Sequence, residues 1–487
     1  MSMNKLEAFN AFVKKLNIYQ PSPVIYDSIA GFSEFGPYGA TIKSSLISKV
    51  KKEFRKVGFW EVEHPIIMPK KVWEASGHIE RFLDIIAESE GKIFRVDKVV
   101  EEEYPQFLLL DRSIEGIKKF LQENKIIPKG QKEPLSNPRE YWLMMMTSVA
   151  GEEATLRPET ATATYSSFKE YYTLFRNSMP IKIFQHGRVF RNEITTRQGL
   201  IRGREFEQIE GQIFVLQENK NEFDLNAKNI NHRVSLLSSQ SQINKTDSVE
   251  VALAETVSNN TLNSTGYAYC FSVVMNILKG IGLGDSQIRF RQHLPDEKAH
   301  YALDAWDVEL KTEQYGWLEI CGIHDRGVYD LTRHQEYSGK KLSVNNSKQE
   351  QEIPNILEIA FGVGRLMYSL LEKGFNIRDE KNILSLPTYL CPIQVAVFPL
   401  MKKDGMSEIA EEINFNLNEE GFISVYDEKG SIGKRYARMD EIGTPFCITV
   451  DHDTLVDNTV TLRDRDTCEQ KRIKISDLSL ELKDILK

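Results

Sequence analysis

Apolar and polar residues alternate on both sides of a charged loop over residues 187–211. Val189 lies in the first alternating run, and Phe206 and Ile209 lie in the second. A period of two residues is typical of strands with one buried face. The pattern therefore predicts two strands joined by a polar loop over residues 195–201.

A helical period comes earlier in the chain, beginning at Ala40 after a glycine-rich turn. One face of this helix is apolar, at Leu46, Val50, Phe54 and Val57. Gly58 is expected to end the helix. An alternating run then predicts a strand that closes at Pro65, and a shorter helix is predicted within residues 1–22.

The second half of the chain predicts strands over residues 317–320 and 356–361, the latter followed by a glycine turn and a helix from Leu366. Two segments interrupt the pattern. Residues 98–140 are expected to form an irregular, partly helical insertion. Residues 216–288 are rich in Asn, Ser and Gln and predict an inserted subdomain of mixed helix and strand.

From about residue 389 strands and helices alternate, which is typical of a separate α/β domain. The predicted elements cover residues 393–398, 405–419, 422–426, 431–441, 446–450, 459–463 and 471–475. Basic residues gather in this segment, at Lys429, Lys434, Arg435, Arg438, Arg463 and Arg465. They predict either contact with RNA phosphates or an ordinary solvated helix face.

Composition narrows the class of protein. A chain of 487 residues is expected to form two to four domains. Its five cysteines include no CxxC pair, which argues against a disulfide framework. No apolar run has signal-peptide or membrane-span length, so we expect a cytoplasmic protein without a membrane partner. The net charge of −8 means that a nucleic acid would meet local basic patches.

The predicted hairpin interleaves arginines with glutamates. Arginine forks match phosphate oxygens, and carboxylates suit Mg²⁺ or the amino group of a ligand. A solvated hairpin with surface ion pairs would show the same alternation. Charge alone therefore leaves both interpretations open.

The spacing within the hairpin is more specific. Residues 190–193 read FRNE and residues 202–206 read RGREF, which resembles motif 2 of the class II aminoacyl-tRNA synthetases. The resemblance implies an ATP site with Arg191 at the α-phosphate, Glu193 at the adenine, Arg202 at the γ-phosphate, Phe206 stacked on the base, and Asn192 and Gly203 beside them.

Two further stretches resemble motifs of that family. The helix and strand over about 40–65 are similar to motif 1, which forms the dimer interface, so the apolar helix stripe predicts a homodimer. Residues 356–370 are similar to motif 3, whose arginine lies over the ATP. This implies that Arg365 acts with Arg191 as a catalytic residue.

Longer blocks resemble the glycyl-tRNA synthetases of the dimeric type over nearly the whole chain. The blocks are LRPETA, RNEITTRQGLIRGREFEQIE, FRQHLPDEKAHYALDAWDVE and GWLEICGIHDRGVYDL. By this resemblance Glu319 and Ile320 contact ATP, and Glu319 holds its Mg²⁺. The implied glycine-binding residues are Arg95, Glu159, Glu210, Glu358 and Ala360.

The resemblance implies an α+β fold with a six- to seven-stranded antiparallel sheet flanked by helices. Residues 1–388 would form the catalytic domain, and residues 389–487 would form an anticodon-binding domain. The implied partners are ATP, glycine and tRNA(Gly). The zinc-binding cysteines of some bacterial relatives are absent, so no zinc is expected.

Two departures from the family bear on glycine. Residues 157–163 read RPETATA, where the family reads RPETAQG, and residues 358–360 read EIA, where the family reads EPS. The missing serine hydroxyl is worth about 1 kcal/mol as one hydrogen bond. The main prediction is therefore an ATP-dependent glycine–tRNA ligase. The alternatives are altered amino-acid specificity, or a non-catalytic nucleic-acid-binding paralogue.

Overall fold

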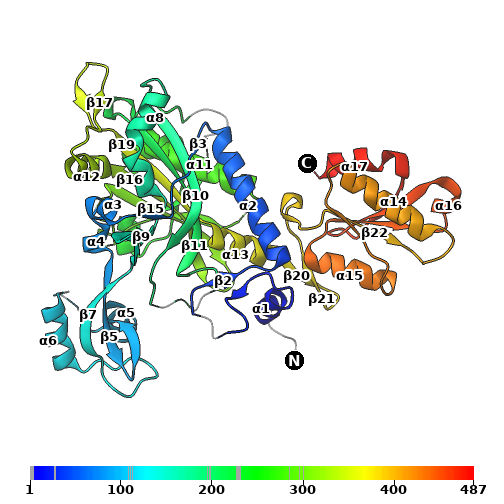
Figure 1. Cartoon of the computed structure of the whole chain (residues 1–487), viewed down its shortest axis with the longest axis horizontal. Coiled ribbons are helices and arrows are strands. Elements are labelled where there is room, and N and C mark those ends of the chain that lie inside the picture. The colour runs from blue at the N-terminus through cyan, green and yellow to red at the C-terminus, as the bar shows by residue number, and fades with distance from the viewer. Residues whose placement is uncertain are drawn as a thin grey trace.

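The computed structural model describes residues 5–486, apart from residues 27, 28, 108, 110, 112, 195, 197, 198, 226–231, 285, 296 and 300. The predicted loop over 195–201 therefore lies partly outside the described residues. Figure 1 shows a large central body, a small lobe at lower left and a C-terminal domain at right. No helix among the described residues is long and apolar enough to cross a bilayer.

A nine-stranded sheet forms the centre of the large body. In spatial order its strands are β13 (Val249–Ala252), β12 (Arg233–Leu237), β14 (Ile288–Gln292), β15 (Asp304–Thr312), β16 (Gly316–Gly327), β19 (Asn355–Gly362), β11 (Glu205–Val215), β10 (Ile181–Phe190) and β3 (Trp60–Glu61). Neighbours are antiparallel except for the pairs β3–β10 and β12–β14. β10 and β11 form the predicted hairpin. The α+β fold with a largely antiparallel sheet is confirmed.

Helices α2 (Pro37–Lys56), α11 (Thr265–Gly280) and α13 (Val363–Gly374) cover one face of this sheet (Figure 1). The α2 stripe is buried against the sheet, and the Phe54 ring stacks on Phe184 at 5.1 Å. Gly211 on β11 makes room for this packing, because a Cβ there would lie 2.7 Å from the Phe54 ring. Helices α7 (Ala161–Ser166), α8 (Phe168–Leu174) and α12 (Tyr329–Ser338) pack around the other face.

The strand predicted to end at Pro65 is shorter than expected. Only β3 pairs with β10, and the chain then crosses to β4 (Ile67–Pro69), which belongs to a separate sheet with β9 (Glu152–Leu156) and β8 (Met145–Val149). Proline has no N–H to donate to a strand ladder, which accounts for the break around Pro65.

The stretch 216–288 is not the separate subdomain that its polar composition predicted. Its strands β12 and β13 extend the central sheet, and its helix α11 lies in the main core. Eleven residues of α11 are buried, including Tyr267 and Phe271. Part of the polar sequence forms the short helix α9 (Ser239–Ile243), and residues 226–231 are outside the described residues.

The small lobe begins earlier than the predicted insertion at residue 98. A three-stranded sheet is formed by β6 (Lys92–Arg95), β5 (Leu83–Ser89) and β7 (Ser136–Trp142), with helices α5 (Val96–Glu103) and α6 (Ile114–Asn124) against it. The lobe has a hydrophobic core of its own. It is therefore a compact unit over residues 83–142 and not an irregular segment.

The C-terminal domain has the alternating order that its sequence predicted. Its five strands, in spatial order, are β23 (Ser424–Tyr426), β22 (Val395–Pro399), β24 (Phe446–Val450), β25 (Thr459–Asp464) and β26 (Gln470–Lys474). The first three are parallel, and β25 and β26 are antiparallel additions. The helices are α14 (Met406–Glu419), α15 (Ile432–Ile442), α16 (Thr454–Asp457) and α17 (Leu478–Ile485).

The remaining described elements are short. They are α1 (Lys5–Lys15), β1 (Gln20–Pro21), β2 (Ser33–Glu34), α3 (Lys70–Ala75), α4 (His78–Arg81), α9 (Ser239–Ile243), α10 (Leu253–Ser258), β17 (Val344–Asn345), β18 (Gln351–Glu352), β20 (Phe375–Arg378) and β21 (Lys381–Leu384), with 3-10 turns at Gln217–Asn219, Thr388–Leu390 and Ile475–Asp477.

Three of the six basic residues considered for RNA contact are structural. Arg435 is buried and donates to Pro399 O at 2.5 Å. Arg465 is buried and donates to Gly443 O at 2.7 Å. Arg463 makes a bidentate pair with Asp440. For these three residues the prediction of RNA contact is wrong, because their donors are used inside the domain.

The Arg463–Asp440 pair fixes α15 to β25. Its two hydrogen bonds measure 2.8 and 2.9 Å, and both side chains are buried. Removing one partner of a buried pair leaves an uncompensated charge.

We therefore expect Arg463→Ala to lower the free energy of unfolding of the C-terminal domain by about 3–5 kcal/mol. Lys434→Ala, an exposed change on the same helix α15, is the matched control and should cost little. Urea unfolding of both variants checks this. Equal stabilities would contradict the structural role of the pair.

Candidate active site

A pocket of about 380 Å³ opens over β11, β19 and β16. Alternate residues of the paired strands β11 and β19 line it, namely Gln208, Glu210, Glu358, Ala360 and Gly362. The residues between them, such as Ile209 and Ile359, lie in the core on the opposite face. This alternation follows from the two-residue period of a strand. The pairing register of β11 and β19 therefore determines which of their residues line the pocket.

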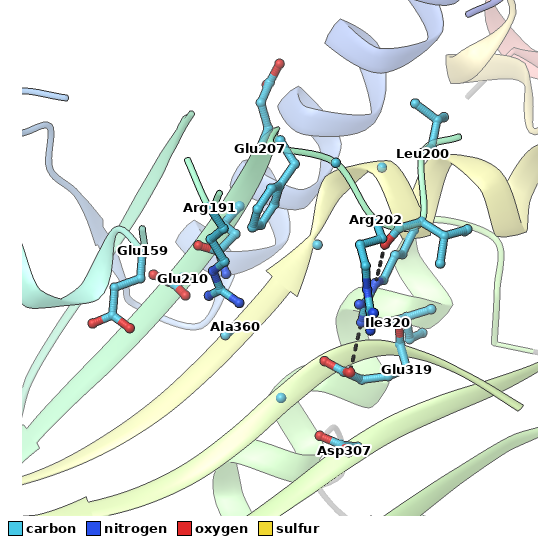
Figure 2. Close-up of a pocket in the computed structure, with 18 of the residues that line it drawn as sticks. Glu159, Arg191, Leu200, Arg202, Glu207, Glu210, Asp307, Glu319, Ile320 and Ala360 are labelled. Carbon is cyan, nitrogen blue, oxygen red and sulfur yellow. Dashed lines mark hydrogen bonds and ion pairs between the residues drawn. The ribbon is translucent and has the colours of Figure 1, made fainter. Parts of the chain in front are cut away.

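The pocket has two chemically different ends. Figure 2 shows Glu159 and Glu210 at one end, Arg202 and Glu319 at the other, and Arg191 between them. The first end is lined by glutamates, and the second combines the cations Arg202 and Arg365 with the carboxylates Glu319 and Asp307.

Arg191 follows the last residue of β10 and points into the pocket. Its Nε donates to Pro158 O at 3.0 Å, and its guanidinium lies 5.3 Å from the Phe206 ring centre and 5.5 Å from that of Phe82. One backbone acceptor and two aromatic rings thus orient the guanidinium. Among the described residues its terminal nitrogens have no hydrogen-bond partner, so they can meet an anion.

The second end is organised by an ion pair between Arg365 and Glu319. Arg365 Nη1 lies 2.9 Å from Glu319 Oε2 and donates to Glu319 O at 3.0 Å. Its Nε donates at 3.2 Å to the backbone oxygen of Ile201, the last residue of the predicted loop. The two side chains are 25% and 46% exposed, so ligand oxygens can reach both.

Glu210 lies directly opposite Ala360 in the β11–β19 register. Thr160 donates to Glu210 Oε2 through its backbone N–H at 2.8 Å and through its hydroxyl at 2.5 Å. Burial, together with the charges of Glu358 and Glu159, raises the pKa of Glu210 to about 8. Glu210 therefore holds a proton at neutral pH in the unliganded protein.

Glu358 is buried but remains ionised. Burial raises its pKa, whereas the Arg326 guanidinium and His324 outweigh burial and hold the pKa below the ordinary value. Tyr165 donates to Oε2 at 2.8 Å, and His324 Nδ1 lies 2.8 Å from Oε1. Arg326 is itself held by Asp330 through bonds of 2.8 and 2.9 Å.

Glu159 precedes helix α7 and is also buried. Burial raises its pKa, but His78 and Arg326 hold the pKa well below its usual range. His78 Nε2 lies 3.4 Å from Oε2, and the Thr162 hydroxyl donates to Oε1 at 2.5 Å. The Thr162 hydroxyl is thus used by Glu159, and Thr162 does not line the pocket.

The structure brings most of the sequence-predicted site residues into this one pocket. Those that line it are Arg191, Glu193, Arg202, Gly203, Phe206, Glu319, Ile320, Arg365, Glu159, Glu210, Glu358 and Ala360. Their individual roles remain predictions.

Two predicted residues lie outside the lining. Arg95 is on β6 of the small lobe, where it lies 2.6 Å from Asp97 and 3.3 Å from Asp84. Asn192 donates its backbone N–H to Leu143 O at 2.8 Å and its side-chain Nδ2 to Trp142 O at 3.4 Å, which ties the residues after β10 to the end of β7. Neither residue is in the lining, but the charge of Glu193, which is in the lining, acts on Arg95. The roles expected for Arg95 and Asn192 remain predictions.

Sequence reasoning missed several residues of the pocket. His324, in the block GIHDRGVYDL, received no role, nor did Arg326, which lies behind the lining and contacts Glu358. His293 and Asp307 pair with each other at 2.9 Å in the lining. The signal was present, because a histidine and an arginine two residues apart on one strand share a face. Their partner Glu358 lies far along the chain, so only the fold shows the contact.

Comparisons with known proteins cover the whole chain. Residues 141–374 match the family "tRNA synthetase class II core domain (G, H, P, S and T)", and residues 394–485 match "Anticodon binding domain". The glycine–tRNA ligase of Methanococcus maripaludis is 34% identical over 99% of this chain and 100% of its own length. That of Pyrococcus furiosus is 35% identical over 100% of both chains.

Solved structures resemble the fold at lower identity. Giardia lamblia prolyl-tRNA synthetase in complex with prolyl-adenylate superposes with a TM-score of 0.62 at 17% identity, covering 98% of this chain and 74% of its own. A structure described as the RNA binding domain of threonyl-tRNA synthetase from Cryptosporidium parvum gives a TM-score of 0.62 at 18% identity, covering 98% of both chains. These two support the fold alone.

The proton on Glu210 gives a prediction for stability. An unfolded glutamate releases its proton near about pH 4.3, whereas folded Glu210 keeps it up to about pH 8. This group therefore stabilises the fold most at low pH, and that contribution is lost as the pH rises through about 8.

We expect the midpoint of thermal unfolding to fall between about pH 6 and pH 9 more steeply in the wild type than in Glu210→Gln, because the amide cannot ionise. Circular dichroism at several pH values measures this. Glu205→Gln, on the same strand but half-buried, should keep the wild-type slope. Parallel slopes for all three proteins would show that Glu210 ionises normally.

Proposed function

The chain belongs to the glycine–tRNA ligase family of the class II aminoacyl-tRNA synthetases, and on that premise we propose that its pocket activates glycine with ATP and transfers it to the 3′ end of tRNA(Gly). The observation that carries the proposal is the division of one pocket into an arginine end and a carboxylate end. The arginine end suits a polyphosphate, and the carboxylate end suits an ammonium group.

ATP would bind at the arginine end. Arg191 would meet the α-phosphate, where negative charge develops as the glycine carboxylate attacks phosphorus and pyrophosphate leaves. Arg202 and Arg365 would hold the outer phosphates, and Phe206 would stack on the adenine. Their contribution is positioning and charge stabilisation, because the groups are fixed before the reaction begins.

Glycine would bind at the carboxylate end. The three buried carboxylates Glu159, Glu210 and Glu358 surround a slot in which an ammonium group finds opposite charge. Glu210 is protonated when the slot is unliganded. Entry of the glycine ammonium would favour loss of that proton, because the positive charge stabilises the ionised carboxylate. Crowding against Ala360 would disfavour a substrate with a larger side chain.

Mg²⁺ would arrive with ATP. Magnesium is usually bound through one or two carboxylates together with substrate phosphates. Among the described residues no group of three or more His, Cys, Asp or Glu side chains is arranged to hold a metal by itself. Glu319 and Asp307, both in the lining, fit the carboxylate share of such a site.

The C-terminal domain would bind the anticodon arm of tRNA. Support comes from its match to the anticodon-binding family over residues 394–485. Lys429 and Lys434 remain exposed and available for phosphate contacts there. A non-catalytic paralogue would not need Arg191, Arg202 and Arg365 in the pocket. The presence of all three therefore favours an enzyme.

The proposed activity is tested by ATP–pyrophosphate exchange with each of the twenty amino acids. Glycine should support exchange far better than any other. Faster exchange with another amino acid would replace glycine as the substrate, and exchange with none would favour the non-catalytic paralogue.

Arg191→Ala should lower glycine-dependent exchange about 100- to 1000-fold, because one fixed donor at the developing charge is lost. Arg188→Ala is the matched control: Arg188 is on β10, three residues before Arg191, is 57% exposed and lies outside the pocket lining. Near wild-type exchange in folded Arg191→Ala would remove this residue from the proposed machinery.

We also propose a homodimer, although not through the apolar helix stripe that the sequence suggested, because that stripe packs inside the chain. The sheet instead ends at β3, where Trp60 is 65% exposed on an open strand edge. Sedimentation at micromolar concentration should give a dimer, and Trp60→Arg should shift it toward monomer. A monomeric wild type would contradict the proposal.

A further inference from the structure

His324 holds a position in the pocket that no role described so far explains. It lies on β16 directly opposite Glu358 in the β16–β19 register. Its Nδ1 is 2.8 Å from Glu358 Oε1, so the ring donates to that oxygen. The His324 side chain is 17% exposed and lines the pocket, whereas Arg326, another donor to Glu358, is only 1% exposed. His324 is thus the donor on the ligand side of the carboxylate.

The ring needs the glycine two residues before it. A Cβ on Gly322 would lie 2.8 Å from His324 Cε1 and 3.2 Å from Nε2. The imidazole therefore lies over Gly322, with its Nε2 edge on this side. Gly322 is the register partner of Ala360, which lies opposite Glu210. The ring thus extends from Glu358 toward the alanine at the centre of the slot.

We propose that His324 is a positioning and specificity residue of the glycine slot, orienting the pocket-side oxygen of Glu358 and occupying the space beside Ala360. The inference rests on the proposed function. Ala360 brings no polar side-chain atom to the slot, and the imidazole lies beside it on the neighbouring strand. Its volume also leaves less room for a substrate Cβ, which is how a slot rejects larger amino acids.

The other restraints on Glu358 do not replace this contact. Tyr165 donates to Oε2, and Arg326 lies at 3.3 Å from Oε1 and 3.2 Å from Oε2. Both hold the carboxylate from the buried side. Without His324, Oε1 would lose its short donor and would keep only the longer 3.3 Å contact with Arg326.

His324→Ala should raise the KM for glycine in the exchange assay by about tenfold or more, the usual effect of one hydrogen bond to a charged group. The KM for ATP should be unchanged, and kcat should change by less than about threefold, because the contact exists before and during the reaction. Exchange with alanine should rise relative to glycine. His324→Asn keeps a donor but is smaller. It should bring the KM for glycine closer to the wild-type value than it brings the preference for glycine over alanine.

Ala360→Ser provides a second, independent measurement. Added to His324→Ala, it should lower the KM for glycine again, because a hydroxyl now enters the vacated space. In the wild type the same change should give no improvement, because the ring already occupies that space. Equal effects in the two backgrounds would overturn the proposal.

His232→Ala is the matched control, since this half-buried histidine also makes one hydrogen bond, 3.0 Å to Asn276, outside the pocket lining. Thermal unfolding verifies that all variants fold, and His324→Asn carries the test if His324→Ala does not. An unchanged KM for glycine, or a parallel rise in the KM for ATP, would overturn the role of His324. Absence of glycine-dependent exchange in the wild type would overturn the proposed function instead.

Discussion

Three carboxylates buried around one pocket are the constraint on which the catalytic domain depends. Glu159, Glu210 and Glu358 are all at most 7% exposed. An uncompensated buried charge costs several kcal/mol, so each group must be paired, hydrogen-bonded or protonated. The protein uses all three solutions: His78 and Arg326 keep two of the groups ionised, and a proton neutralises the third. The ammonium group of the proposed substrate would complete this balance.

The register of the central sheet keeps Glu210 and Glu358 in the pocket and out of the apolar core. β11, β19 and β16 lie side by side although they come from distant parts of the chain, and their register places Glu210, Ala360 and Gly322 in one row. The same strands bury apolar residues on the opposite face, against α2, α11 and α13 (Figure 1). A shift of one residue would move the carboxylates into the apolar core, so the core packing also fixes the site.

Arginine shows how burial decides what one residue type does. Arg191 and Arg365 keep donors toward the pocket because only part of each guanidinium is used by the protein. Arg326, Arg463 and Arg465 are buried, and they spend their donors on carboxylates and backbone oxygens. The sequence alone could not distinguish the pocket arginines from the buried ones, because it shows where an arginine is but not which acceptors it meets.

The sequence by itself determined the elements and the arginine end of the pocket. The hairpin, the strand–turn–helix at Arg365 and the α/β tail are set by local periodicity and turn chemistry, and those signals lie within short stretches. Only the tertiary structure decided that residues 216–288 join the main sheet, that Arg95 pairs inside the lobe, and that His324 meets Glu358. These outcomes depend on pairing between strands far apart in the chain, and no local pattern records which partner a buried side chain will find.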